Sequence, residues 1–79
     1  MNGINTLEIL EGKVEDVVYH NESNDYTIFT LSTKDGILET AVGNIPFVCE
    51  GELVALQGQF TLHRKFGRQF AFEIGRAHV

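Results

Sequence analysis

The sequence predicts an all-β domain of five short strands. From residue 36 onward, six glycines recur every seven to nine residues, and the runs between them are rich in Val, Ile, Thr, Phe and Tyr. Short β-rich runs separated by turn signals at this spacing are typical of a sandwich or a small barrel. No window of eleven residues keeps apolar groups at helical spacing without a glycine or proline, so a long helix is not expected. The six glycines are Gly36, Gly43, Gly51, Gly58, Gly67 and Gly75.

The first strand is expected over residues 10–20, with a bulge near Glu15-Asp16. Leu10 and Val14 share one side of an ideal strand, whereas Val17 and Tyr19 share the other. A slip of one residue moves side chains to the opposite face, so a β-bulge between the two pairs would reconcile them. A long, bulged first strand that bends from one sheet into another is a feature of small barrels.

The second and third strands are expected to form a hairpin. Residues 26–33 are apolar on both faces, as in a central strand that is covered on two sides. Residues 37–43 follow a tight turn at Lys34-Asp35-Gly36, where the Asp-Gly pair supplies the positive φ that a hairpin requires.

The segment that follows, residues 44–50, is too short for a full helix and contains Pro46. We expect it to plug one end of a barrel with Ile45, Phe47 and Val48. Cys49 comes next and has no basic neighbour that would activate its thiol, so a buried structural thiol is expected.

The fourth and fifth strands, residues 52–62 and 69–74, show the clearest alternation. Gly58 falls on the apolar face of the fourth strand, where a missing side chain lets a small barrel bend tightly. The side chains expected to face inward are Val54, Leu56, Phe60 and Leu62 in the first run and Phe70, Phe72 and Ile74 in the second.

Five strands with a short plug segment instead of a full helix between strands 3 and 4 match the OB-fold, a five-stranded Greek-key barrel. An SH3-like barrel is the nearest alternative, but the long bent first strand and the position of the plug favour the OB-fold. We expect an N-terminal arm over residues 1–9, the OB-fold domain over 10–75, and a tail over 76–79 that starts a linker or is a remnant of cloning. The expected core is Val14, Ile28, Leu31, Val42, Val54, Leu56, Phe60, Phe70 and Phe72.

Size and charge narrow the functional classes. A chain of 79 residues buries only about 60% of its unfolded surface, which favours a module over a stand-alone enzyme. The formal net charge is −5, but residues 1–60 carry −8 and residues 61–79 carry +3. The acidic part argues against a protein that coats nucleic acid over its whole surface, so an anionic partner must meet the C-terminal part.

The same composition predicts a cytoplasmic protein without a membrane partner. The single cysteine cannot form an internal disulfide, which fits a reducing compartment. No run of eighteen apolar residues could cross a membrane as a helix, and Met1–Leu10 lacks the features of a secretory signal.

No catalytic, cofactor or metal motif is found in the sequence. His20, His63 and His78 have no metal-ligand spacing, and the first two are interpreted as surface turn residues. Ser23 and Ser32 lack an adjacent His or Lys that would activate a nucleophile, and no Walker-type glycine loop occurs. The chain by itself is therefore not expected to be an enzyme.

One loop combines positive charge with an aromatic ring. Arg64, Lys65, Phe66 and Arg68 join the fourth and fifth strands, and in OB-folds the loops after strands 1 and 4 flank the ligand face. Cations that neutralise phosphates beside a ring that stacks on a base are typical of single-stranded nucleic-acid binding. The alternative is a solvated turn with Phe66 folded back on the barrel, and this loop alone favours that alternative. The opposite loop, residues 21–25, is acidic and would repel a phosphate chain.

Several short motifs occur in a familiar order: Gly-Lys-Val-Glu at 12–15, His-Asn-Glu at 20–22, Asn-Asp-Tyr-Thr at 24–27, Val-Gly-Asn-Ile-Pro at 42–46, Gly-Glu at 51–52 and Lys-Phe-Gly-Arg-Gln-Phe at 65–70. Together they resemble the N-terminal OB domain of RecD-like DNA helicases, the exodeoxyribonuclease V alpha-subunit family, over about residues 10–74. The resemblance implies an accessory barrel ahead of an ATP-driven motor that moves 5′ to 3′ on single-stranded DNA. ATP and Mg²⁺ would belong to the motor domains, whose motifs are not found in these residues.

Two positions depart from the family pattern. The family usually has glycine where Asp25 stands, which suggests a different turn in this chain. It usually has proline and tyrosine where Arg64 and Phe66 stand, so this chain adds a charge to the basic loop.

Three functions remain open. The leading one is an accessory OB module of a RecD-like helicase that touches single-stranded DNA weakly. The second is a structural module that docks on the motor domains of the same polypeptide through its acidic face, and the third is a free-standing single-strand-binding OB protein. A reading frame that continues past Val79 into a Walker motif would exclude the third.

Overall fold

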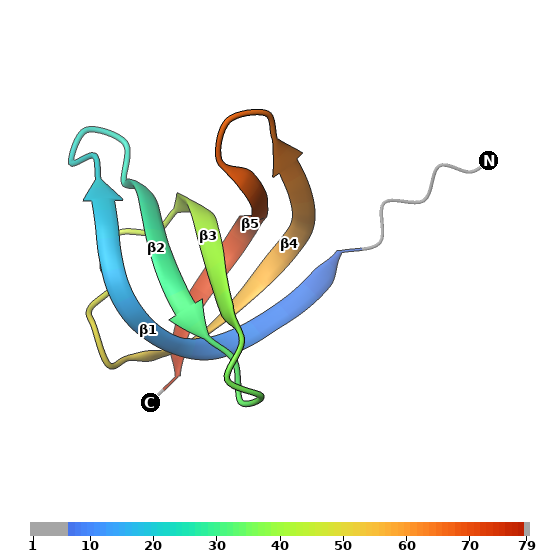
Figure 1. Ribbon diagram of the computed structural model, residues 1–79. Coiled ribbons are helices and arrows are strands. Elements are labelled where there is room, and N and C mark those ends of the chain that lie inside the picture. Colours follow the sequence, from blue (N-terminus) through green and yellow to red (C-terminus); the bar gives the residue numbers. More distant parts are fainter. Residues whose placement is uncertain (1–6, 79) are drawn as a thin grey trace.

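Five strands close into a barrel in the computed structural model, which describes residues 7–78 (Figure 1). Around the barrel the order is β1-β2-β3-β5-β4, and every neighbouring pair is antiparallel except β3 with β5. This arrangement confirms the predicted all-β barrel and agrees with the Greek-key order of an OB-fold. The strands are β1 (Glu8–His20), β2 (Tyr26–Ser32), β3 (Leu38–Asn44), β4 (Leu53–His63) and β5 (Gly67–His78).

The long first strand serves both sides of the barrel. The first half of β1 pairs with β4 and the second half with β2, so the strand bends around the core. Its register against β2 shifts between Val14 and Asp16, which confirms the predicted bulge. A second shift, between Val17 and Tyr19, was not predicted, and it turns Tyr19 outward.

Gly58 allows β4 and β5 to approach closely. A Cβ atom at this position would overlap the carbonyl oxygen of Ala71 and lie 2.6 Å from Cα of Phe72. The register of β4 against β5 also shifts at Gly58, so the strand pair bends where the side chain is missing. The predicted role of this glycine is confirmed. The predicted hairpin turn is confirmed as well, since Gly36 has a φ of 80°.

The core follows the prediction on β1 and over most of β4 and β5, and departs from it on β2 and β3. On β4, Leu62 was expected to face inward but is 83% exposed. On β2, Thr27, Phe29 and Leu31 point inward, whereas Tyr26 and Ile28 lie on the outer face and are partly exposed. The expectation that β2 is covered on both sides is therefore wrong, because the barrel covers only its inner face. On β3, Ala41 lies in the core, whereas Val42 is buried outside it because it pairs with the outward-facing Ile28. Phe60 packs against the core while partly exposed. The predicted residues found in the core are Val14, Leu31, Val54, Leu56, Phe70 and Phe72, and Phe29, Ala41 and Ile45 complete it.

The segment between β3 and β4 acts only partly as a plug, and residues 45–52 form no helix. Ile45 is buried and Val48 packs against the core, as predicted. Phe47 is 85% exposed and Cys49 is exposed, so their predicted burial is wrong. Backbone hydrogen bonds between this segment and Val14, from Gly51 N–H to Val14 O and from Val14 N–H to Glu52 O, hold the second half of the segment at the surface.

The strand ends also differ from the prediction. β1 starts at Glu8, so it takes in part of the predicted arm, while residues 1–6 lie outside the described part of the chain. β5 continues past Ile74 to His78 and takes in most of the predicted tail, and Val79 lies outside the described residues. Ile74 is 44% exposed rather than inward, because the register shift on β5 reverses the alternation after Phe72.

Candidate nucleic-acid interface

The two loops that flank an OB-fold ligand face project from the same end of this barrel. The β1–β2 loop, residues 21–25, and the β4–β5 turn, residues 64–66, both rise at the top of the view in Figure 1. The outer face of β2 and β3 extends from this end down the barrel. OB-folds bind oligonucleotides on this face and with these loops, so the basic turn lies where a ligand is expected.

The β4–β5 turn presents an aromatic ring to solvent. His63 pairs with Gly67 across the turn, and Gly67 closes it with a φ of 81°, which glycine adopts without strain. Phe66 is 67% exposed, so it is not folded back on the barrel as the alternative interpretation required. Its ring lies 4.7 Å from that of His63, with an angle of 32° between the planes.

The three cations of this region have different surroundings. Arg68 donates a hydrogen bond to Oε2 of Glu39 at 3.1 Å, and its guanidinium lies 4.0 Å from the ring centroid of Phe60. Lys65 Nζ lies 5.7 Å from the ring centroid of Phe66, near the outer limit of a cation–π contact. Within residues 7–78, Arg64 has no side-chain partner. The charge of Arg68 is therefore balanced by Glu39, while no acidic side chain among the described residues pairs with Arg64 or Lys65.

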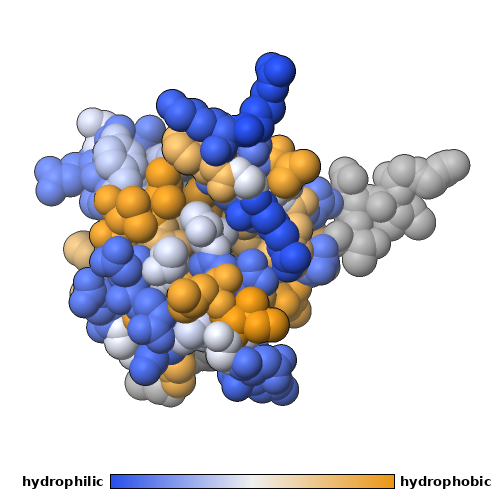
Figure 2. Space-filling model, viewed as in Figure 1, coloured by the Kyte–Doolittle hydropathy of each residue, from blue (hydrophilic) through white to orange (hydrophobic). Residues whose placement is uncertain are grey.

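Figure 2 shows the hydropathy of the surface at this end of the barrel. Strongly hydrophilic side chains rise from the top of the barrel around the β4–β5 turn, above a face on which hydrophobic and hydrophilic areas mix. Arg64 and Lys65 are exposed at the tip of this hairpin, where their positive charge attracts an anionic partner.

Two tyrosines on the outer face were missed as candidate site residues. Tyr19 is 47% exposed and Tyr26 is 36% exposed. Tyr19 pairs with Ile28 in register, and Ile28 lies on the same side of β2 as Tyr26, so both rings belong to one face. The sequence pattern suggested only one bulge in β1, which left Tyr19 on the same face as Val17. It also suggested that β2 is covered on both faces, so Tyr26 was expected to be buried.

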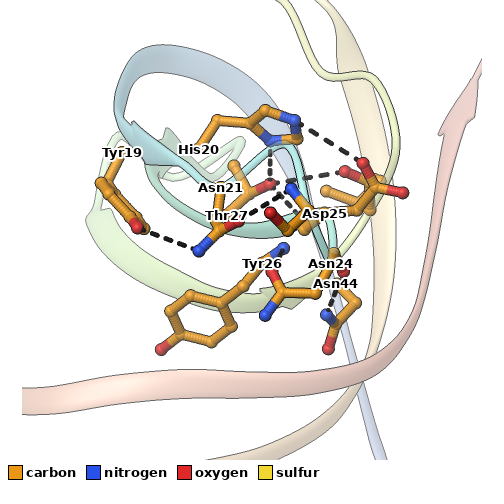
Figure 3. Close-up of polar contacts among 10 residues, drawn as sticks. Tyr19, His20, Asn21, Asn24, Asp25, Tyr26, Thr27 and Asn44 are labelled. Carbon is orange, nitrogen blue, oxygen red and sulfur yellow. Dashed lines mark hydrogen bonds and ion pairs between the residues drawn. The ribbon is translucent and has the colours of Figure 1, made fainter.

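The β1–β2 loop is held by its own asparagines (Figure 3). Asn21 Oδ1 accepts the N–H of Ser23 at 2.8 Å, and Asn24 Oδ1 accepts the N–H of Tyr26 at 2.9 Å. Asn21 N–H in turn donates to the carbonyl of Tyr26 at 2.8 Å. These local bonds fix the start of β2 and hence the position of Tyr26.

Asp25 has a backbone conformation that is unusual for a residue other than glycine. Its φ is 63°, in the left-handed region that glycine adopts most easily and that Asp tolerates. The backbone therefore has a conformation that glycine also adopts, so the change from glycine to Asp25 does not by itself require a different turn.

A buried hydroxyl joins this loop to the barrel (Figure 3). Thr27 is fully buried, and its Oγ1 lies 2.9 Å from the carbonyl oxygen of Asp25 and 2.8 Å from Nδ1 of His20. The hydroxyl has one proton, which it donates to the carbonyl, so Nδ1 of His20 is the donor in the second bond. His20 therefore lies at the surface as expected, but its ring has a structural role in holding the loop.

The loop end of the barrel is acidic on one side. Glu22 is exposed on the β1–β2 loop, and Asp16 is exposed on β1 opposite Thr30.

In the part of the chain that the structure describes, no three His, Cys, Asp or Glu side chains come together as a metal site. Within residues 7–78 no helix has the length and hydropathy needed to cross a membrane.

A comparison with known protein families identifies the domain. Residues 7–78 match the OB-fold domain of the ATP-dependent DNA helicase YrrC. The match spans all five strands, the β1–β2 loop and the basic β4–β5 turn. It confirms the OB-fold and the prediction that the domain is of a kind found in a DNA helicase.

Proposed function

The chain belongs to the family of the YrrC helicase OB-fold domain, and we propose that it is the accessory N-terminal module of a RecD-like 5′–3′ helicase and contacts single-stranded DNA weakly. ATP and Mg²⁺ would bind to motor domains elsewhere in that polypeptide, and the cytoplasm is its proposed location. A helicase acts on DNA, and we therefore assign the surface of this domain that would contact the strand.

The exposed ring of Phe66, beside Arg64 and Lys65 at the tip of the hairpin, is the observation that supports this proposal. Aromatic rings stack on bases of any sequence, while nearby cations neutralise phosphates, so the combination suits a single strand. A duplex has its bases stacked inside, where one ring on a turn cannot meet them. We therefore assign base stacking to Phe66 and phosphate contacts to Arg64 and Lys65.

Arg68 has a different proposed role. Its guanidinium is already bonded to Glu39 and packed on Phe60, so it supports the hairpin more than it attracts DNA. Tyr26, exposed on the outer face of β2, provides a second ring for a strand that continues across the ligand face. Tyr19 is less suited, because it shares β1 with the exposed carboxylate of Asp16.

Fluorescence anisotropy of the 79-residue chain with a labelled oligonucleotide tests the proposal. Each phosphate neutralised on a single strand contributes about 0.7 to the slope of log K against log salt, so two cations predict a slope of about −1.4. We expect dissociation constants in the range of roughly 10⁻⁴ to 10⁻⁶ M, as for nonspecific binding.

Charge reversal provides the control. Arg64→Glu with Lys65→Glu should abolish binding and leave the fold intact. Lys13→Glu with Lys34→Glu makes the same change in net charge on exposed residues away from the hairpin, and it should weaken binding only slightly. No binding at low salt, or equal losses in the two double variants, would overturn the proposal.

A second candidate function is docking on the motor domains of the same polypeptide. A cleft of about 610 Å³ lies between the first half of β1 and the β2–β3 turn, and at its rim Ile9 is 70% exposed and Leu53 is 54% exposed. His78, near the end of β5, pairs with Leu53, so in a helicase the following segment would leave the barrel beside this cleft. A cleft with exposed apolar side chains at its rim suits a packed contact better than the acidic face that the sequence suggested.

This candidate has its own test. In a full-length helicase, Ile9→Asp with Leu53→Asp should speed hydrogen exchange of the β1 amides if the cleft is covered by the motor, and leave single-strand binding by the hairpin unchanged. Equal exchange in the parent and the variant would reject docking at this cleft.

A further inference from the structure

His63 holds the basic turn through a single nitrogen atom. Its Nδ1 accepts the backbone N–H of Lys65 at 3.0 Å and the backbone N–H of Phe66 at 3.2 Å. The two donors lie two and three residues further along the chain, which is the spacing at which Asn, Asp and Ser side chains stabilise turns. Asn21 shows the same arrangement in the β1–β2 loop, where its Oδ1 accepts the N–H of Ser23. His63 thus stabilises the basic turn by accepting nearby backbone N–H groups, as Asn21 does in the β1–β2 loop.

The two hydrogen bonds determine the state of the imidazole. A nitrogen that accepts N–H groups has no proton, so Nδ1 is bare and the neutral ring carries its proton on Nε2. Other charged groups of this turn are Arg64 and Lys65, both cations, and the residue that pairs with His63 on β5 is Gly67. The side chain therefore acts here as a neutral acceptor among positive charges.

The same ring also contacts the proposed stacking residue. The centroids of His63 and Phe66 lie 4.7 Å apart, within the range of stacked aromatic pairs. Phe66 is thus held twice, through its backbone N–H and through its ring, yet it remains 67% exposed. A ring ordered before it binds loses less side-chain entropy when a base stacks on it.

We propose that His63 is a positioning residue of the single-stranded DNA contact, which orders the turn and presents Phe66 to a base. The inference rests on the proposed function of the hairpin. It adds to Arg64, Lys65 and Phe66 a residue that need not touch DNA, and it assigns the imidazole a hydrogen-bonding role rather than a charge contact.

Three variants separate the two parts of this role. His63→Asn keeps an acceptor at the right spacing and removes the ring, His63→Phe keeps a ring and removes the acceptor, and His63→Ala removes both. Ordering one side chain is worth about 0.5–1.5 kcal/mol, so His63→Ala should weaken oligonucleotide binding by roughly two- to tenfold. The Asn and Phe variants should each recover part of this loss. His63 is exposed at a turn, so all three variants should unfold near the parent temperature.

A double-mutant cycle distinguishes positioning from a general effect on the fold. Phe66→Ala should weaken binding less in the His63→Ala background than in the parent, because a disordered Phe66 ring contributes less to the binding free energy. Nitrogen NMR should find the proton of His63 on Nε2, and the salt slope should be the same with and without the imidazole.

The outcomes keep this inference apart from the proposed function. Binding that disappears on Arg64→Glu with Lys65→Glu but is unaffected by His63→Ala overturns the role of His63 alone, as does strict additivity in the cycle. No binding by the parent chain overturns the hairpin proposal, and the role of His63 with it.

Discussion

Arg68 reaches across to Glu39 and ties the start of β5 to the start of β3 through a hydrogen bond of 3.1 Å. These two strands share only two register pairs, Ala41 with Phe70 and Val42 with Ala71. The Arg68–Glu39 pair therefore extends the short contact between β3 and β5 toward the β4–β5 hairpin.

Replacement of Arg68 should affect stability more than DNA binding. Arg68→Gln removes the ion pair with Glu39, whose side chain is only 13% exposed, and the cation–π contact with Phe60. Together these contacts contribute about 1 kcal/mol to the free energy of unfolding. The salt slope of oligonucleotide binding should stay near its parent value, whereas Arg64→Gln should reduce its magnitude by about 0.7. Urea denaturation and anisotropy measure the two effects, and a reduced slope for Arg68→Gln would show that Arg68 contacts phosphate after all.

Gly58→Ala should destabilise the barrel strongly. The new methyl group would overlap the carbonyl of Ala71, so β4 and β5 would have to separate where they bend. We expect a loss of about 1–3 kcal/mol or more in the free energy of unfolding. Gln59→Ala, at the next and exposed position, should change stability by less than about 0.5 kcal/mol. Equal stability of the two variants would show that the strands are not in close contact at Gly58.

The left-handed backbone of Asp25 predicts an unusual ranking of substitutions. Asp25→Gly should leave stability unchanged or slightly higher, because glycine adopts a φ of 63° without strain. Asp25→Val should cost about 1–2 kcal/mol, since a β-branched residue fits this region poorly. Thermal unfolding of the two variants tests the ranking, and a valine variant as stable as the glycine variant would contradict it.

Cys49 should react readily in the folded protein. Its side chain is exposed because backbone hydrogen bonds to Val14 hold the segment before β4 at the surface. A thiol reagent such as dithionitrobenzoate should label the native chain at a rate close to that of the urea-unfolded chain. Labelling that is slower by a factor of a hundred would mean that the thiol is buried.

Much of the fold could be predicted because strong local patterns agree with the barrel. The alternation in β4 and β5, the Asp35-Gly36 turn and the first bulge of β1 each depend on residues close together in the chain. The errors arise where the backbone departs from regular alternation. The second register shift in β1 exposes Tyr19, and the shift on β5 exposes Ile74. Neither shift can be recognised from the order of apolar and polar residues in the sequence.

The candidate site could be predicted only in its composition. Adjacent cations and an aromatic residue identified the hairpin, but the pairing of Arg68 with Glu39 joins residues that are far apart in the sequence. The role of His63 depends on the rotamer of its ring, and a histidine at the end of a strand does not indicate it. The exposure of Phe47 and Cys49 likewise depends on how the segment before β4 lies on the barrel, where Gly51 and Glu52 hydrogen-bond to the distant Val14.

Backbone amide NMR of the 79-residue chain, titrated with a short single-stranded oligonucleotide, tests the DNA-contact proposal most directly. The proposal predicts that chemical-shift changes gather at residues 63–68, extend to Tyr26, and weaken with salt. The amides of Ile9 and Leu53, at the cleft beside the first half of β1, should not change. Changes confined to the cleft, or no changes at low salt, would contradict the proposal that the basic hairpin meets the DNA strand.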